Sequence, residues 1–128
     1  MKKLCYHFSL FIEFKKNIDV NEIANRYKVK PHKITTYEKS VSPVPSAKIW
    51  YKSKDLSDFD VGEQFYQFLL FIKENFSDLK QVLAENNGGA NADIIIEEMP
   101  EYPAIYFTKE TIELLSELGL EVDTDCYE

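Results

Sequence analysis

The chain has 128 residues and a formal net charge of −7, with 45% apolar and 29% charged residues. These values are typical of a globular protein and exclude an intrinsically disordered chain. The length predicts one domain over residues 1–128, with a core large enough to need no disulfide or metal. No apolar run approaches the roughly 20 residues of a membrane span, so we expect no membrane association.

The charge is divided unevenly along the chain. Residues 1–54 hold 12 of the 15 Lys and Arg and 4 of the 22 acids, a formal charge of +8, whereas residues 55–128 carry −15. Such asymmetry favours charged partners but says little about the fold.

The chain opens with a predicted strand and a short helix. Residues 4–14 alternate with period two, which indicates a strand with one buried face. The apolar members of that face are Leu4, Tyr6, Phe8, Leu10, Ile12 and Phe14. Asp19 and Glu22 form a capping-box pattern at the start of a helix, which ends before Pro31.

The middle of the chain predicts two more strands and a long helix. The strands are expected at 34–39 and 47–52, separated by a loop at 40–46 whose prolines lack backbone donors. A helix at 61–85 follows Asp60, because apolar residues recur there at steps of three and four. These residues include Val61, Phe65, Phe68, Leu69, Ile72, Phe76, Leu79 and Leu83.

The remaining third predicts a short helix between strands. The run Asn86-Asn87-Gly88-Gly89 is expected to supply the left-handed residues that end the long helix, and strands are expected at 92–98 and 104–107. Thr108 should cap a helix that Gly119 closes. Residues 120–127 then alternate again, as a strand with one acidic face.

The predicted order is β-α-β-β-α-β-β-α-β. It indicates an α+β fold, a two-layer sandwich in which helices cover one face of a mainly antiparallel sheet. The first six elements match the split β-α-β arrangement of ferredoxin-like domains.

Three local patterns, combined with this order, resemble a known family. They are residues 8–12 leading to Asp19, residues 49–51, and residues 114–123 ending at Tyr127. On these the chain is similar to domain-of-unknown-function family 4279. The resemblance implies a small α+β cytoplasmic protein of bacteria, with a place among toxin-immunity or defence-linked proteins. The family supplies no established catalytic residues.

The sequence contains few candidate catalytic residues. Neither His7 nor His32 has Cys, Asp or Glu at metal-ligand spacing, and a solvated or hydrogen-bonded His7 is the expected state. Cys5 and Cys126 are expected to be small structural thiols. We therefore expect no catalytic residues, no metal and no cofactor.

Trp50 is flanked by lysines on a predicted strand. Interleaved aromatic and basic residues are also found where proteins stack single-stranded nucleic acid. The net charge opposes that function, so we expect no nucleic-acid partner and a tryptophan packed under a loop or helix. Trp50 nevertheless remains a candidate partner-binding residue.

Acidic residues form the strongest functional signal, in two sets. The sets are Glu97, Glu98 and Glu101, and Glu121, Asp123 and Asp125. An acidic face of this kind accelerates encounter with a basic partner. Acids also serve simply to keep a small protein in solution.

The function expected from these features is non-enzymatic binding of a basic protein, in its most specific form an immunity-type inhibitor of a basic bacterial toxin. Two alternatives remain open: a small hydrolase-like enzyme that uses the Asp123 and Asp125 face, and a regulatory ligand-binding module. The first residues alternate and do not form the continuous apolar core of a signal peptide. We therefore expect both cysteines to be reduced thiols and the protein to be cytoplasmic. The sequence does not determine an oligomeric state.

Overall fold

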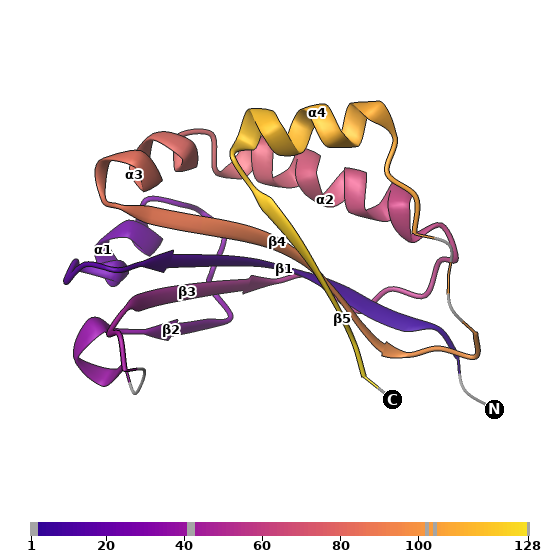
Figure 1. Ribbon diagram of the computed structural model, residues 1–128, viewed down its shortest axis with the longest axis horizontal. Coiled ribbons are helices and arrows are strands. Elements are labelled where there is room, and N and C mark those ends of the chain that lie inside the picture. The colour runs from indigo at the N-terminus through magenta and orange to yellow at the C-terminus, as the bar shows by residue number, and fades with distance from the viewer. Residues whose placement is uncertain (1–2, 41–42, 102, 104, 128) are drawn as a thin grey trace.

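The computed structural model describes residues 3–40, 43–101, 103 and 105–127. Its elements in chain order are β1 (Cys5–Phe14), α1 (Val20–Asn25), β2 (Lys33–Thr35), the 3-10 helix η1 (Tyr37–Lys39), β3 (Ala47–Lys52), α2 (Val61–Asn75), α3 (Leu79–Glu85), β4 (Gly88–Glu98), α4 (Lys109–Leu118) and β5 (Glu121–Cys126). Figure 1 shows α2, α3 and α4 together on one side of a twisted sheet. The predicted α+β class is confirmed.

The sheet has the strand order β2-β3-β1-β4-β5. The first four strands pair antiparallel, and β5 pairs parallel to β4. The α1 connection from β1 to β2 skips the place that β3 later fills, and β1 lies between β3 and β4. This is the split β-α-β arrangement expected from the element order. The α4 crossover then adds β5 as an edge strand, because a parallel neighbour needs a long connection.

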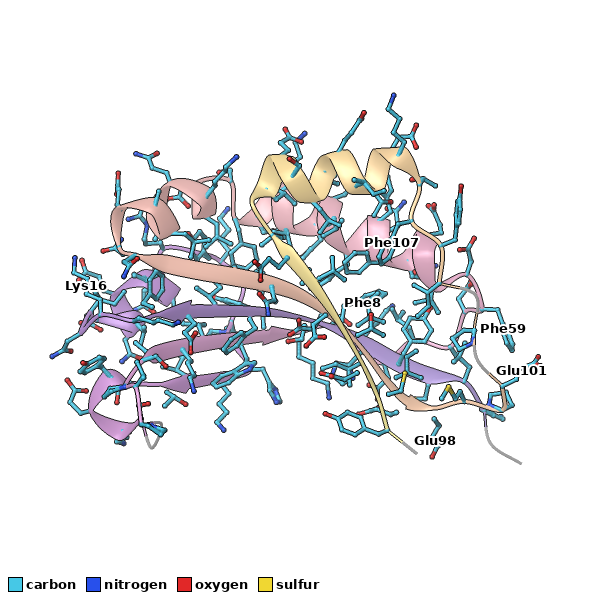
Figure 2. The ribbon with its side chains drawn as sticks, viewed as in Figure 1. Phe8, Lys16, Phe59, Glu98, Glu101 and Phe107 are labelled. Atoms are coloured by element: carbon cyan, nitrogen blue, oxygen red, sulfur yellow. The ribbon has the colours of Figure 1, made fainter. Side chains whose placement is uncertain are left out.

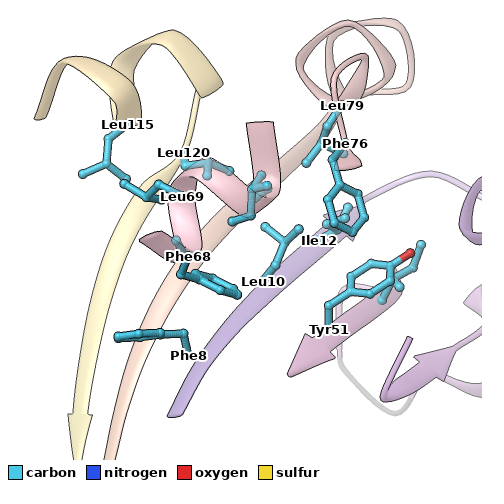
Figure 3. Close-up of a cluster of buried hydrophobic side chains, with 14 of the residues drawn as sticks. Phe8, Leu10, Ile12, Tyr51, Phe68, Leu69, Phe76, Leu79, Leu115 and Leu120 are labelled. Carbon is cyan, nitrogen blue, oxygen red and sulfur yellow. The ribbon is translucent and has the colours of Figure 1, made fainter. Parts of the chain in front are cut away.

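The core lies between the sheet and the helices (Figure 3). On β1 the predicted apolar face is buried, with Tyr6, Phe8, Leu10, Ile12 and Phe14 each at most 1% exposed. Helix α2 packs Phe65, Phe68, Leu69 and Ile72 onto this face, and α1, α3 and α4 complete the same cluster. Aromatic rings fill much of the layer, since buried Phe and Tyr side chains contribute large apolar areas.

The helix ends follow their local chemistry. The side chains of Asp19, Asp60 and Thr108 accept hydrogen bonds from backbone N–H groups in the first turns of α1, α2 and α4. Gly119 ends α4 with a φ of 70°, a left-handed conformation that favours glycine. These four predictions are confirmed because capping depends on a few neighbouring residues only.

The predicted helix at 61–85 is wrong in one respect, because it is broken into α2 and α3. The break begins at Phe76, whose ring inserts between Tyr27 and Tyr51 at centroid distances of 4.7 and 4.8 Å. Asp78 starts α3 and pairs with Arg26. The apolar spacing continues across the break, so periodicity alone did not detect it. The predicted burial of the stripe is confirmed.

The predicted strand at 104–107 is also wrong. Ala104 lies outside the described residues, and residues 105–107 are irregular. The Phe107 ring packs against Phe65 of α2 at 5.3 Å, so this segment crosses the helical layer instead of joining the sheet. Figure 2 shows Phe107 beside α2, above Phe8 on the sheet.

This crossing depends on Gly62, near the start of α2. A Cβ at position 62 would lie 2.1 Å from the Tyr106 carbonyl oxygen. Alanine favours a helix over glycine by about 1 kcal/mol, but the overlap requires backbone displacement, which typically costs about 1–3 kcal/mol. Gly62→Ala should therefore lower the midpoint of thermal unfolding. Gly89→Ala, whose Cβ meets nothing within 4 Å, is the control and should not. Equal midpoints would contradict the prediction.

Two smaller predictions need correction. The strand expected at 34–39 is only the three-residue β2, followed by η1. Of the four residues expected to end the long helix, Asn87 does take the left-handed conformation, with φ 54°, directly after α3 and its cap Asn86. Gly88-Gly89 instead begins β4. Among the described residues, no helix is both long enough and apolar enough to cross a membrane.

Candidate functional site on the helix-free face

The candidate functional surface is the helix-free face, the side of the sheet opposite the helices. The strand register aligns its side chains in rows that cross the strands. One row consists of Lys33, Trp50, Phe11, Asn91 and Glu121. The next row consists of Lys52, Ser9, Asp93 and Asp123. Each row runs from a lysine on β2 or β3 to an acid on β5.

Trp50 lies in the basic half of this face. Its ring is 5.0 Å from that of Phe11, and the Lys33 Nζ lies 5.2 Å from the tryptophan centroid. The prediction that Trp50 packs under a loop or helix is wrong, because it alternates with Ile49 and Tyr51, which face the core. A lysine over an indole face is attracted by the ring quadrupole, so Lys33 stabilises the position of Trp50.

The acidic half contains what we call the acidic strip: Asp93, Glu121, Asp123 and Asp125. The last three are exposed, and the register places all four on the helix-free face. Asp93 pairs with Asp123 across neighbouring strands, which lie about 4.8 Å apart. Among residues 3–40, 43–101, 103 and 105–127, no basic side chain forms an ion pair with any member of the strip.

Asp93 is the unusual member of the strip. Its Oδ1 is buried and has no hydrogen-bond partner among the residues that the structure describes. Burial, reinforced by the charges of Asp123 and Asp125, raises the pKa of Asp93 to about 6. The sequence analysis did not single out Asp93, because the Ile94–Ile96 run indicated a buried strand. The alternation of Asn91, Asp93, Ile95 and Glu97 was the available signal for a second, polar face.

The other predicted acids lie elsewhere. The pairing of β1 with β4 shifts between Cys5 and Tyr6, so that Glu98 pairs with Cys5 and Ile96 with Tyr6. Glu97 is the extra residue of this bulge. Figure 2 shows Glu98 and Glu101 toward the end of the sheet where β1 begins. Both are exposed.

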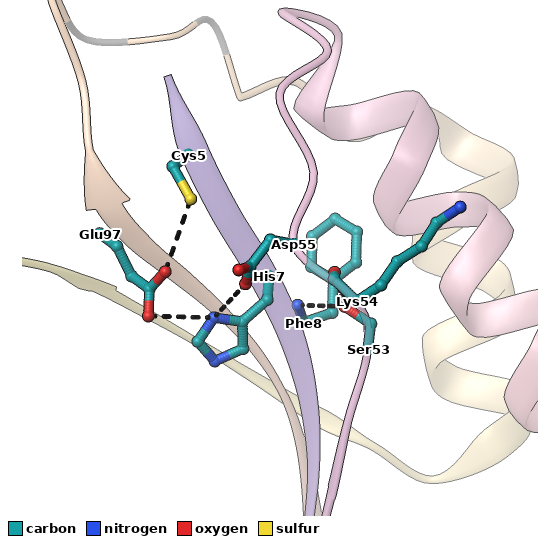
Figure 4. A network of polar contacts seen from close by, with 7 residues as sticks. All are labelled: Cys5, His7, Phe8, Ser53, Lys54, Asp55 and Glu97. Atoms are coloured by element: carbon teal, nitrogen blue, oxygen red, sulfur yellow. Dashed lines mark hydrogen bonds and ion pairs between the residues drawn. The ribbon is translucent and has the colours of Figure 1, made fainter. Parts of the chain in front are cut away.

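The bulge directs Glu97 toward Cys5 and His7 (Figure 4). The Cys5 thiol donates a hydrogen bond to Glu97 Oε2 at 3.6 Å. His7 Nδ1 lies 3.6 Å from Glu97 Oε1 and 4.0 Å from Asp55 Oδ1. His7 is on the face opposite the apolar one, as expected, but it is only 7% exposed and its Nδ1 has no hydrogen bond. It is thus neither solvated nor hydrogen-bonded at that atom.

This grouping was not predicted from spacing along the sequence. Asp55 lies in the segment after β3. This segment is joined to β1 by hydrogen bonds between the backbones of Leu56 and Tyr6. The missed signal was Cys5-x-His7, since residues two apart in a strand share a face. Cys5 and Cys126 are both free thiols, and Cys126 is exposed.

A shallow pocket of about 470 Å³ occupies the other end of the helix-free face. Gly89 leaves space beside Phe11, since a Cβ there would meet nothing within 4 Å, whereas a Cβ on Gly88 would point at Phe14 and Leu83 in the core. Glu13, Lys15, Asn91 and Glu121 supply polar groups around it.

Comparison with known proteins identifies one family. The model of domain of unknown function 4279 (DUF4279) matches residues 3–128. Neither the curated proteins nor the solved structures gave a significant match. Because the family match spans essentially the whole chain, the protein belongs to the DUF4279 family.

Proposed function

We propose that this protein is a non-enzymatic binding protein that recognises a basic protein through the acidic strip. The observation that carries the proposal is the Asp93 carboxylate, whose buried Oδ1 has no hydrogen bond. Leaving a buried acceptor unsatisfied costs about 1–3 kcal/mol. A Lys or Arg side chain from a partner would pair with the exposed carboxylates of the strip and relieve their repulsion with Asp93.

Arginine fits this strip better than lysine. Its planar guanidinium presents parallel donors that match carboxylates bidentately. Asp93 and Asp123 are register partners on adjacent strands, so one guanidinium can contact both. We therefore expect the partner to present an arginine at the centre of a basic surface.

The rest of the helix-free face sets the orientation of that partner. Lys33, Lys48 and Lys52 lie on β2 and β3, which β1 and β4 separate from β5. A basic surface placed across them would be repelled, whereas the acidic strip would attract it. This charge gradient selects one docking orientation, which is a contribution to specificity and association rate more than to affinity.

The most specific form of the proposal is an immunity-type inhibitor that acts on a basic bacterial toxin in the cytoplasm. Inhibition would result from covering the toxin's basic surface. The two free thiols support a reducing compartment, and the charge of −15 on residues 55–128 supports a basic target.

The test compares two double variants with equal charge change. Asp123→Asn with Asp125→Asn alters the strip, whereas Glu74→Gln with Glu110→Gln alters exposed positions in α2 and α4. Each bait is used to isolate partners from the source cell, and association rates are measured at about 0.05 M and about 0.3 M salt. The strip variant should associate about tenfold more slowly at low salt and lose most of the salt dependence.

Kinetics that are the same for both double variants would contradict the proposal. Capture of a partner that has no basic surface would also contradict the proposal. If the partner is toxic to cells, protection by the wild type and by the helix variant, but not by the strip variant, supports the narrower immunity function.

A further inference from the structure

The end of the helix-free face at which β1 begins contains four potential metal ligands from three separate segments. Cys5 and His7 come from β1, Asp55 from the segment that follows β3, and Glu97 from the bulge in β4 (Figure 4). The ligand atoms of Cys5, Asp55 and Glu97 all lie within 4.8 Å of one another. His7 is not one of these three mutually close residues, but its Nδ1 lies 3.6 Å from Glu97 and 4.0 Å from Asp55.

The contacts of His7 with the two carboxylates are not hydrogen bonds, because nitrogen–oxygen distances of 3.6 and 4.0 Å are too long. Zinc binds nitrogen and oxygen at about 2.0 Å and sulfur at about 2.3 Å, so the ligand atoms of a tetrahedral site with one sulfur lie about 3.3–3.5 Å apart. The Cys5–Glu97 and His7–Glu97 distances, both 3.6 Å, are close to that spacing, and the His7–Asp55 distance of 4.0 Å has to shorten on binding.

The state of His7 is a second, independent observation. The residue is 7% exposed, and among the described residues its Nδ1 faces two carboxylates without a hydrogen bond. An imidazole nitrogen in this position is available as a metal ligand.

We infer that Cys5, His7, Asp55 and Glu97 form a tetrahedral zinc site, a feature that goes beyond the proposed binding function. Mixed sulfur, nitrogen and oxygen ligands suit zinc and disfavour magnesium and calcium, which take oxygen ligands. On binding, the Cys5 thiol releases its proton to solvent, and the thiolate and two carboxylates face the divalent ion. The side chains of Asp55 and Glu97 are 61% and 40% exposed, which leaves a path for entry.

Four protein ligands fill a tetrahedral zinc site, so no position remains for water and the ion is structural. It joins the start of β1 to the segment after β3 and to the β4 bulge. These are the places where regular pairing ends: Leu56 is joined to Tyr6 by an isolated bridge, and the β1–β4 register shifts beside Cys5.

The test uses the full chain, stripped with a chelator and titrated with zinc against a competing chromophoric chelator. One equivalent should bind and raise the midpoint of thermal unfolding. Glu97→Gln and Cys5→Ser should each weaken zinc affinity by at least about tenfold, the lower bound seen when partners of metal ligands are removed. Cys126→Ser and His32→Gln replace the other cysteine and histidine and should bind zinc like the wild type.

Cobalt(II) provides a readout that a general folding defect does not imitate. Tetrahedral binding through Cys5 produces a thiolate-to-cobalt charge-transfer band, which Cys5→Ser should abolish and Cys126→Ser should retain. Absence of stoichiometric zinc binding at micromolar concentration would overturn the inference. Unchanged affinity in Glu97→Gln, a partly exposed position where substitution leaves the core intact, would also overturn it.

Discussion

Replacing Phe65 with alanine is expected to lower the free energy of unfolding by about 3–5 kcal/mol. The side chain is fully buried, and its ring contacts Phe8 of β1 at 5.4 Å and Phe107 at 5.3 Å. It therefore joins the sheet, α2 and the segment that leads to α4. Because domains of this size are stable by only about 5–15 kcal/mol, the loss is a large share of the total.

Phe71→Ala is the matched control, because it makes the same chemical change in the same helix. Phe71 is 41% exposed, so its replacement should cost less than about 1 kcal/mol. Urea denaturation of both variants at neutral pH measures the difference. Similar midpoints would show that α2 does not bury the face assigned to it.

Replacing Asp93 with asparagine is expected to stabilise the protein at pH 7.5 by about 1–2 kcal/mol. Its pKa of about 6 lies above the ordinary value of 3.8 for an aspartate, and this difference corresponds to at most about 3 kcal/mol, which partial solvation reduces. Below about pH 4 the carboxyl is protonated in both states and contributes no penalty. Between about pH 4 and pH 6 the unfolded chain ionises first, so the wild type loses stability as the pH rises.

Unfolding in metal-free buffer across this pH range tests the sign as well as the size of the effect. The two stability curves should meet below about pH 4 and separate through pH 6. Asp123→Asn is the control, because that side chain is exposed and raises the pKa of Asp93 only through its charge, and the asparagine oxygen can still accept the Thr124 N–H. Asp123→Asn should stabilise the protein less than Asp93→Asn does. A benefit from Asp93→Asn that persists at pH 3.5 would indicate a packing effect instead.

The acidic strip and the predicted zinc site illustrate different limits of sequence reasoning. Glu121, Asp123 and Asp125 were recognised together, since alternation within one strand places them on one face. Asp93 joins them only through the parallel register of β4 with β5, which depends on the α4 crossover. Asp55 reaches His7 through pairing between segments 48 residues apart, which no local pattern reports.

The sequence by itself determined the features that depend on near neighbours. These are the buried face of β1, the caps at Asp19, Asp60 and Thr108, the left-handed end at Gly119 and the α+β class. Each depends on residues close in sequence: the alternation of a strand, the three-and-four spacing of a helix, and the capping of a single helical turn. Tertiary structure decided the break at Phe76, the passage of residues 105–107 over α2, and the position of the half-buried Trp50 on the helix-free face. In each case a contact between distant segments outweighed local preference: the Phe76 ring between two tyrosines, Phe107 against Phe65, and a sheet covered by helices on one side only.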